Sequence, residues 1–177
     1  EAYGSAVLMN DIDLNDQAWV PISVVTDTTT RKGYTGTFDG QGHTISGLNA
    51  IVDPETSGAK GAALFGHVYG GTIKNLTVKG ISNGENYTAG IAAILFNGTI
   101  SDCTSDVTVN GARMIGGITG CMSNADCKLI RCANTGNITG NDTGAVGGVC
   151  GTANKGEINA CYNSGTVTCT GNKRQTG

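Results

Sequence analysis

The chain has 177 residues, of which 38% are hydrophobic and only 14% are charged, and its net charge is −3. With no stripe of Lys and Arg to neutralise phosphates, nucleic acid is excluded as an expected partner. No apolar run approaches the roughly 18 residues of a membrane-spanning helix. The 29 glycines follow no Gly-X-Y period, which excludes a collagen-like chain.

Residues 1–35 are the least regular part of the chain. Residues 10–14 alternate polar and apolar side chains, a pattern typical of a strand with one buried face, and it places Ile12 and Leu14 inward. Residues 19–22 follow as an apolar plug. We predict that residues 1–35 form an irregular N-terminal cap that shields the first repeat from solvent.

Residues 36–177 repeat one pattern, an aliphatic residue followed three positions later by a second core-type residue. The first members, at positions 45, 73, 100, 129 and 158, are 28, 27, 29 and 29 residues apart. The pairs are Ile45/Leu48, Ile73/Leu76, Ile100/Cys103, Leu129/Cys132 and Ile158/Cys161. Such a steady period indicates a solenoid in which each repeat stacks on the next.

The frequency of glycine, the length of the repeats and the number of leucines indicate which class of solenoid the chain forms. Glycines are too frequent for helices, the repeats are too short for propeller blades, and leucines are too few for a leucine-rich repeat. We therefore predict an all-β fold: a single-stranded, right-handed parallel β-helix of about five turns of 27–29 residues, in one continuous domain.

Equivalent positions in such a fold stack into columns about 4.8 Å apart. Besides the two columns made by the pairs, two more are expected inside: Leu64, Ile91, Ile118 and Val149, and then Val78, Val109, Ile138 and Val167. The residues before the first column are expected outside: Thr44, Thr72, Thr99, Lys128 and Glu157. After residue 169 the sequence offers nothing apolar to cover the last turn, so we expect the chain to be a piece of a longer protein.

Seven cysteines leave at least one thiol unpaired in a monomer. Cys103, Cys132 and Cys161 fall on one interior column, where a reduced cysteine serves as a small apolar side chain. We expect these three thiols to react only after unfolding. The state of Cys121, Cys127, Cys150 and Cys169 stays open, with disulfides from Cys121 to Cys127 or to Cys150 as alternatives.

Three groups of side chains are candidates for a metal-binding or catalytic site. Asp11, Asp13 and Asp16 resemble the start of a calcium loop but lack its later Gly and Glu ligands, so a half-buried strand is favoured. His43 is close in sequence to Asp39, and a His–carboxylate pair could act as a general base, but no nucleophile accompanies it. His67 is expected in the neighbouring turn as a corner residue. No catalytic, cofactor-binding or metal-binding residue is assigned.

The sequence resembles bacterial surface proteins built from GLUG-type repeats, which are named after a Gly-Leu-any-Gly phrase. Residues 10–14, 19–22 and 36–48 are similar to the start of such proteins, and residues 63–66, 117–120 and 148–151 are similar to the phrase. The resemblance covers residues 8–169, although Ala93 departs from the phrase. It implies a β-helix in a large exported protein, often adhesin-like or the non-catalytic region of a surface enzyme such as an immunoglobulin-A peptidase.

Two functions follow as hypotheses. The favoured one is a non-catalytic structural or adhesive module, located outside the cell or at its surface, that spaces or displays other domains and binds a host protein or glycan. The alternative is a carbohydrate-active β-helix, similar to polysaccharide lyases and hydrolases, whose chemistry would require acidic and basic residues on one face of adjacent turns. Asp39, Lys128 and Glu157 are the residues on which that alternative would depend.

Overall fold

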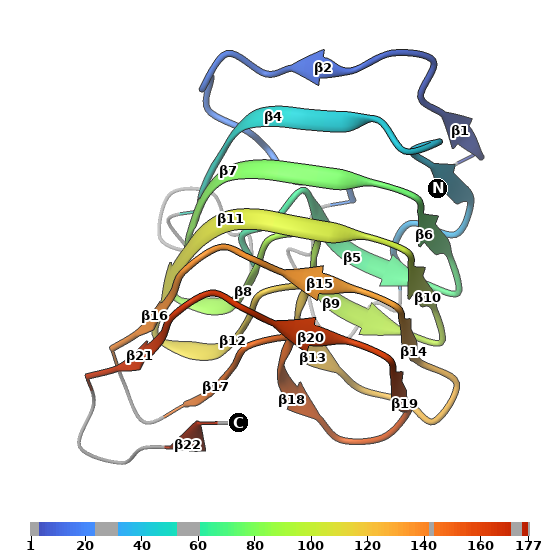
Figure 1. Cartoon of the computed structure of the whole chain (residues 1–177). Coiled ribbons are helices and arrows are strands. Elements are labelled where there is room, and N and C mark those ends of the chain that lie inside the picture. The colour runs from blue at the N-terminus through green and yellow to red at the C-terminus, as the bar shows by residue number, and fades with distance from the viewer. Residues whose placement is uncertain (1–3, 24–31, 53–60, 142–143, 171–174, 177) are drawn as a thin grey trace.

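The computed structural model describes residues 4–23, 32–52, 61–141, 144–170 and 175–176. The described residues form 22 strands and no helix, and the strands stack in about five turns (Figure 1). Neighbouring strands pair in parallel from the first turn to the last. The all-β parallel β-helix predicted from the period is confirmed. No helix in this part of the chain is long and apolar enough to cross a membrane.

Two sheets run from the first turn to the last. The first contains β1 (Ala6–Val7), β3 (Thr37–Asp39), β6 (Thr72–Lys74), β10 (Thr99–Ser101), β14 (Lys128–Ile130) and β19 (Glu157–Asn159). The second contains β2 (Ile12–Asp13), β4 (Thr44–Ile51), β7 (Thr77–Asn83), β11 (Thr104–Gly111), β15 (Ala133–Asn134) and β20 (Tyr162–Asn163), with β16 (Ile138–Gly140) and β21 (Val167–Cys169) beside it.

Two shorter sheets close the other side of the solenoid. One contains β8 (Asn86–Ala89), β12 (Arg113–Gly116), β17 (Ala145–Gly147) and β22 (Gln175–Thr176). The other contains β5 (Phe65–Tyr69), β9 (Ala92–Phe96), β13 (Thr119–Met122) and β18 (Cys150–Ala153). Since successive turns visit the sheets in the same order, a residue lies beside its counterpart one turn away.

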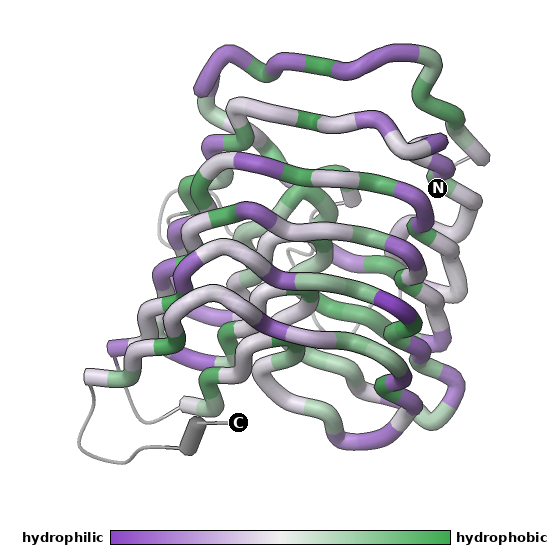
Figure 2. Tube along the Cα trace, in the orientation of Figure 1, coloured by the Kyte–Doolittle hydropathy of each residue, from purple (hydrophilic) through white to green (hydrophobic). Residues whose placement is uncertain are grey.

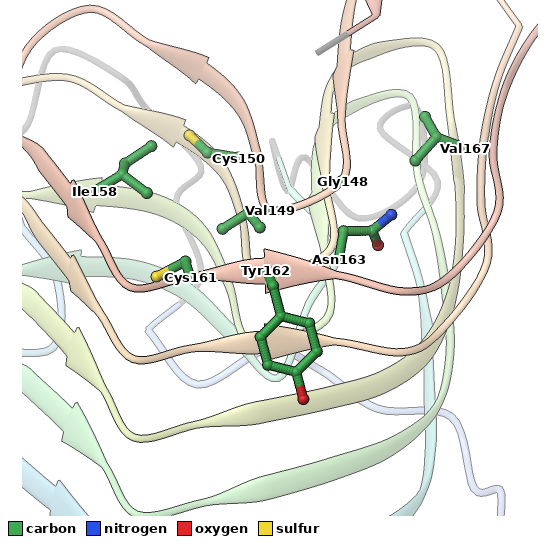
Figure 3. A pocket seen from close by; sticks show the side chains of 8 residues that line it. All are labelled: Gly148, Val149, Cys150, Ile158, Cys161, Tyr162, Asn163 and Val167. Atoms are coloured by element: carbon green, nitrogen blue, oxygen red, sulfur yellow. The ribbon is translucent and has the colours of Figure 1, made fainter.

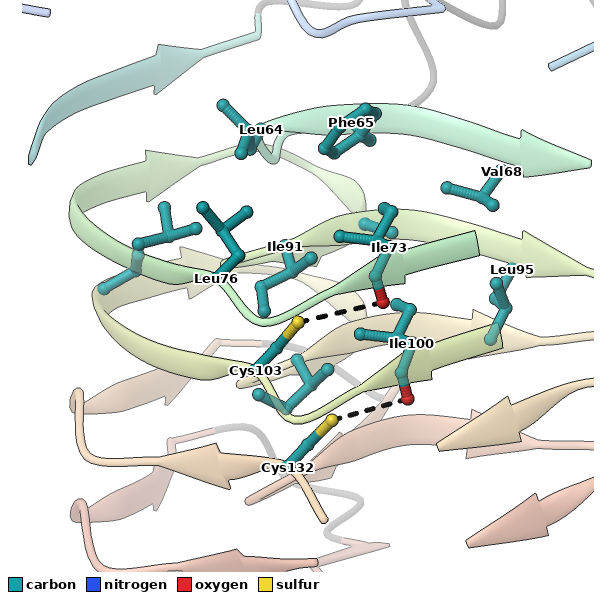
Figure 4. Packing of buried hydrophobic residues seen from close by; sticks show 14 of the residues in the cluster. Leu64, Phe65, Val68, Ile73, Leu76, Ile91, Leu95, Ile100, Cys103 and Cys132 are labelled. Atoms are coloured by element: carbon teal, nitrogen blue, oxygen red, sulfur yellow. Dashed lines mark hydrogen bonds between the residues drawn. The ribbon is translucent and has the colours of Figure 1, made fainter. Parts of the chain in front are cut away.

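The interior is a stack of apolar columns. Ile73, Ile100 and Leu129 pair in register and are fully buried, as the repeat predicts. Ile91 and Ile118 occupy a second predicted column beside them, and Figure 4 shows the aliphatic side chains of neighbouring turns in contact. Each such side chain contributes roughly 1.5–3 kcal/mol by leaving water. In Figure 2 the hydrophobic positions accordingly recur from turn to turn.

The first glycine of the repeated phrase has a steric cause. A Cβ on Gly117 would overlap the side chain of Asn134 and the carbonyl of Gly148, and one on Gly90 would overlap Ser105. Asn134 is fully buried, and its Nδ2 donates hydrogen bonds to the Gly136 carbonyl at 2.7 Å and to Asn163 Oδ1 at 2.7 Å. The solenoid is narrow here, and only glycine leaves room for a polar side chain that crosses it.

The register predicted for the first repeat is wrong. Phe38, not Ile45, pairs with Ile73, and Ile45 pairs with Val78. Phe38 and Ile45 are seven positions apart, whereas Ile73 and Val78 are five apart, because residues 40–43 form a turn in which Gln41 and Gly42 have φ of 50° and 84°. The first outside position is accordingly Thr37 rather than Thr44.

Val78 is also misplaced in the fourth predicted column. It pairs with Ser105, while Ser82 pairs with Val109, which continues to Ile138 and Val167 as predicted. Ser82 is fully buried although it is polar. The narrow interior holds the small Ser82 at the position where a hydrophobic residue was expected.

The first turn belongs to the same sheets as the repeats. β1 pairs with β3, and β2 pairs with β4, so Ile12 lies beside Ile45 in an interior column. Ile12 is nevertheless 40% exposed, because β2 pairs with β4 alone among the described strands, whereas Leu14 packs against the core. The division of the chain at residues 35 and 36 stays a prediction.

Candidate functional site

The charged side chains of the outer wall pair between neighbouring turns. Asp39 lies 3.1 Å from Lys74 Nζ and accepts hydrogen bonds from Asn75 Nδ2 and the Gln41 backbone N–H, each at 3.0 Å. The Asn75 amide, the Gln41 N–H and the Lys74 ammonium together lower the pKa of Asp39 to about 2. A carboxylate held this firmly in its ionised form is poorly suited to accept a proton near neutral pH.

The position of His43 in the sequence suggested a pair with Asp39, but the structure pairs His43 with Asp11 instead. Its Nδ1 lies 3.0 Å from Asp11 Oδ1, which also accepts a hydrogen bond from the Thr44 backbone N–H at 2.9 Å. These contacts lower the pKa of Asp11, the Thr44 N–H more than the His43 side chain. The His–carboxylate pair therefore ties the first turn to the second.

The remaining acidic residues of the first turn serve the local backbone. Asp13 Oδ1 accepts a hydrogen bond from the Asn15 N–H at 2.8 Å, and Asp16 has a φ of 52° in the same bend. Among the described residues, no three His, Cys, Asp or Glu side chains are placed to hold a metal ion. Asp13 and Asp16 thus belong to a local bend of the backbone.

Two further ion pairs join adjacent turns. Arg131 donates from Nε and Nη2 to the two carboxylate oxygens of Asp102, at 2.6 and 2.7 Å, and lowers the pKa of that carboxyl. Lys79 Nζ lies 3.9 Å from Asp106. The sequence had not predicted these partners.

The predicted outer pair Lys128 and Glu157 is adjacent in the β14–β19 register but has no ion pair within 4.0 Å. Instead Glu157 Oε1 accepts a hydrogen bond from Asn159 Nδ2 at 3.1 Å. The two residues lie side by side as predicted, and Glu157 bonds within its own strand.

His67 lies on β5 and is buried, with its ring edge-on to Tyr69 at 6.0 Å. Burial lowers its pKa, which favours the neutral imidazole at neutral pH. No Asp or Glu among the described residues forms an ion pair with it. It lies in the middle of β5 (Phe65–Tyr69) rather than at the corner expected of it.

All seven cysteines lie within the described residues, and all are free thiols. Cys103 and Cys132 are buried on one column, and their Sγ atoms lie 3.8 and 3.5 Å from the carbonyl oxygens of Ile73 and Ile100 (Figure 4). The Cys132 side chain and burial raise the pKa of Cys103 well above its usual range. These two positions confirm the interior column.

Cys161, the third member, corrects the expectation of full burial, because it is only half-buried in the last turn. Neither disulfide alternative for Cys121 is formed. Burial, and to a lesser degree the neighbouring Cys127 thiol, raise the pKa of Cys121 to about 11. Burial raises the pKa of Cys150 to about 12.

A hollow lies beside the last turn. It has a volume of about 580 Å³, and Figure 3 shows the side chains around it. The lining residues are Gly148, Val149, Cys150, Ile158, Cys161, Tyr162, Asn163 and Val167. Ile158 is 46% exposed and Tyr162 is 59% exposed. The hollow borders the apolar core, and its lining residues include no Asp, Glu, His, Lys or Arg.

Comparisons with known proteins were made for the sequence and for the fold. No protein-family model matches the chain. The chain is 42% identical over 101 residues to halomucin from Haloquadratum walsbyi, which is 56% of this chain and 1% of halomucin. A solved structure from Bacteroides ovatus, of a protein assigned as an immunoglobulin A1 protease, has a TM-score of 0.60 and 18% identity and covers 96% of this chain and 72% of that one. At that identity the likeness shows the β-solenoid fold.

Proposed function

We propose that the chain is a structural module of a cell-surface or secreted protein of the GLUG-repeat type. The observation that carries this proposal is that the charged side chains contact one another between neighbouring turns. The Asp11–His43 hydrogen bond and the ion pairs Asp39–Lys74, Lys79–Asp106 and Asp102–Arg131 each join one turn to the next. Acidic and basic side chains, the types that an enzyme uses for proton transfer, instead bind to each other between neighbouring turns.

The likeness to halomucin, which its name presents as a mucin, supports a structural role outside the cell. It covers a very small part of that protein, which is consistent with a module that acts beside further domains. Five steps from β1 to β19, at about 4.8 Å each, make a block only ~24 Å tall. Such a block spaces or displays what is joined to it, and its outer wall is the surface that would bind a host protein or glycan.

The alternative of a carbohydrate-active enzyme is tested on the intact chain. Incubation with a panel of polysaccharides should yield no new reducing ends and no unsaturated products. Cleavage by the wild type that is lost in Asp39→Asn and kept in Asp126→Asn would overturn the proposal, since Asp126 is exposed and forms no ion pair with the described residues.

The adhesive part of the proposal needs its own measurement. Glycan-array and host-cell binding of the labelled chain should show retention that a heat-unfolded sample lacks. If the folded chain is retained by nothing on either surface, the adhesive part is wrong and only the spacer role stands.

A further inference from the structure

The sequence contains five Asn-x-Thr triplets, the motif that marks an acceptor of an N-linked glycan in an exported protein. They begin at Asn75, Asn86, Asn97, Asn137 and Asn141. To accept a glycan in the folded chain, a triplet needs an unbound amide nitrogen and a threonine hydroxyl that a transferase can reach. Four of the triplets lie wholly within the described residues, and the structure distinguishes them by these two requirements.

The triplet at residues 137–139 lies on the outer wall, at the start of β16, which pairs with β11 and β21 (Figure 1). Asn137 extends the strand by one residue, since its carbonyl accepts the Val109 N–H at 2.9 Å. Residues two apart on a strand point to the same face. Ile138 is accordingly fully buried, whereas Asn137 is exposed and Thr139 is half-buried on the outside.

One hydrogen bond fixes the orientation of the Asn137 side chain. The backbone N–H of Thr166, in the next turn, donates to Asn137 Oδ1 at 3.0 Å. An N–H group can donate to the amide oxygen but not to the amide nitrogen, so Oδ1 faces Thr166 and Nδ2 does not. Asn137 Nδ2 donates no hydrogen bond to another described residue. The atom to which a glycan attaches is therefore unbound, and its modification leaves the Oδ1 bond in place.

The other described triplets are less suited as acceptors. Asn75 Nδ2 donates to Asp39 Oδ1 at 3.0 Å, so this amide nitrogen is already bound in the wall. Thr88 is fully buried, which places the hydroxyl of its triplet out of reach. Asn97 has a φ of 53°, so its triplet does not begin in extended backbone as the triplet at residues 137–139 does.

We propose that Asn137 is an acceptor of an N-linked glycan, an inference that rests on the proposed location outside the cell. In the reaction, Nδ2 bonds to the anomeric carbon of an oligosaccharide that is carried as a lipid-linked phosphate ester. The bond from that carbon to the phosphate oxygen breaks, the lipid phosphate leaves, and Nδ2 loses one of its two protons. Asn110 and Thr168 flank Thr139 in register and are uncharged, so neither repels a glycan.

The folded chain, a purified oligosaccharyltransferase and a lipid-linked oligosaccharide test this proposal, and mass spectrometry of the peptides locates the glycan. One glycan per chain is expected, on Asn137. Thr139→Val removes the hydroxyl and should abolish transfer, whereas Thr139→Ser keeps a hydroxyl and should retain it. Asn75→Gln, the matched control, should accept as much glycan as the wild type. Circular dichroism shows that each variant keeps its β signal.

Three outcomes would overturn the proposal: a folded wild type that gains no glycan while a heat-unfolded sample gains one, equal transfer to Asn75 and Asn137, or transfer that persists in Thr139→Val. The unfolded sample should gain glycans on further triplets, because unfolding frees the Asn75 amide and exposes Thr88. Failure of this experiment would leave the spacer role standing, since that role needs no glycan on the wall.

Discussion

Ile100 in the middle of the solenoid and Ile158 in its last turn stand in the same column of the same sheet. Ile100 is fully buried between Ile73 and Leu129, whereas Ile158 pairs with Leu129 alone among the described residues and is 46% exposed. The same contrast separates Cys132 from Cys161. In a solenoid, the burial of a residue thus depends on the turns beside it, and stability is a sum over contacts between neighbours.

The largest effect is expected from truncating the column at these two positions. Ile100→Ala removes a fully buried side chain and should lower the free energy of unfolding by about 2–5 kcal/mol. Ile158→Ala should cost less than half as much, because its side chain already contacts water. Urea unfolding measures both, and equal losses would mean that the last turn is covered in solution.

Thiol labelling compares the reaction rates of an inner cysteine and a cysteine of the last turn. Cys132 is buried between Cys103 and Cys161, whereas Cys161 borders the open hollow. Cys161 should react with a thiol reagent about 100-fold faster than Cys132, a ratio that corresponds to an opening cost of ~3 kcal/mol. Mass spectrometry of timed samples gives both rates, and Cys161→Ser should remove only the faster signal.

The repeated glycines provide a third comparison. An added methyl group on Gly117 meets the buried Asn134 and the Gly148 backbone, whereas on Gly148 its three nearest neighbours all belong to the exposed Asn163 side chain. Gly117→Ala should therefore cost about 1–3 kcal/mol of stability by overpacking, and Gly148→Ala should cost less. Thermal unfolding of both variants is the measurement, and the reverse order would refute the steric account.

The sequence predicted the part of the fold that follows from repetition. A constant spacing between Ile73, Ile100 and Leu129 requires equal turns, and equal turns place these residues in one column. The predicted register was wrong where spacing and hydrophobicity disagreed. Because of the turn at Gln41 and Gly42, Ile45 has the spacing of the repeat, but Phe38 occupies the column position.

The wall was less predictable than the core, for a physical reason. Core residues obey one rule, the exclusion of water, and they recur in every turn. A surface pair such as Asp39–Lys74 requires only that two long side chains reach each other, which many neighbours could do. Which carboxylate His43 would meet therefore depended on the register of the first turn, the feature that sequence reasoning had misplaced.

The smallest effect is expected on the wall, where pairing changes the pH dependence of stability. The pKa of Asp39 is lowered from 3.8 to about 2 in the folded chain, so folding favours the ionised carboxylate. The stability that this provides is present above pH 4 and is lost as the pH falls through about 2. Asp39→Asn should unfold at a slightly lower temperature than the wild type at pH 7, and the difference should vanish near pH 2. A difference that persists there would mean that Asp39 stabilises the wall through its shape and hydrogen bonds rather than its charge.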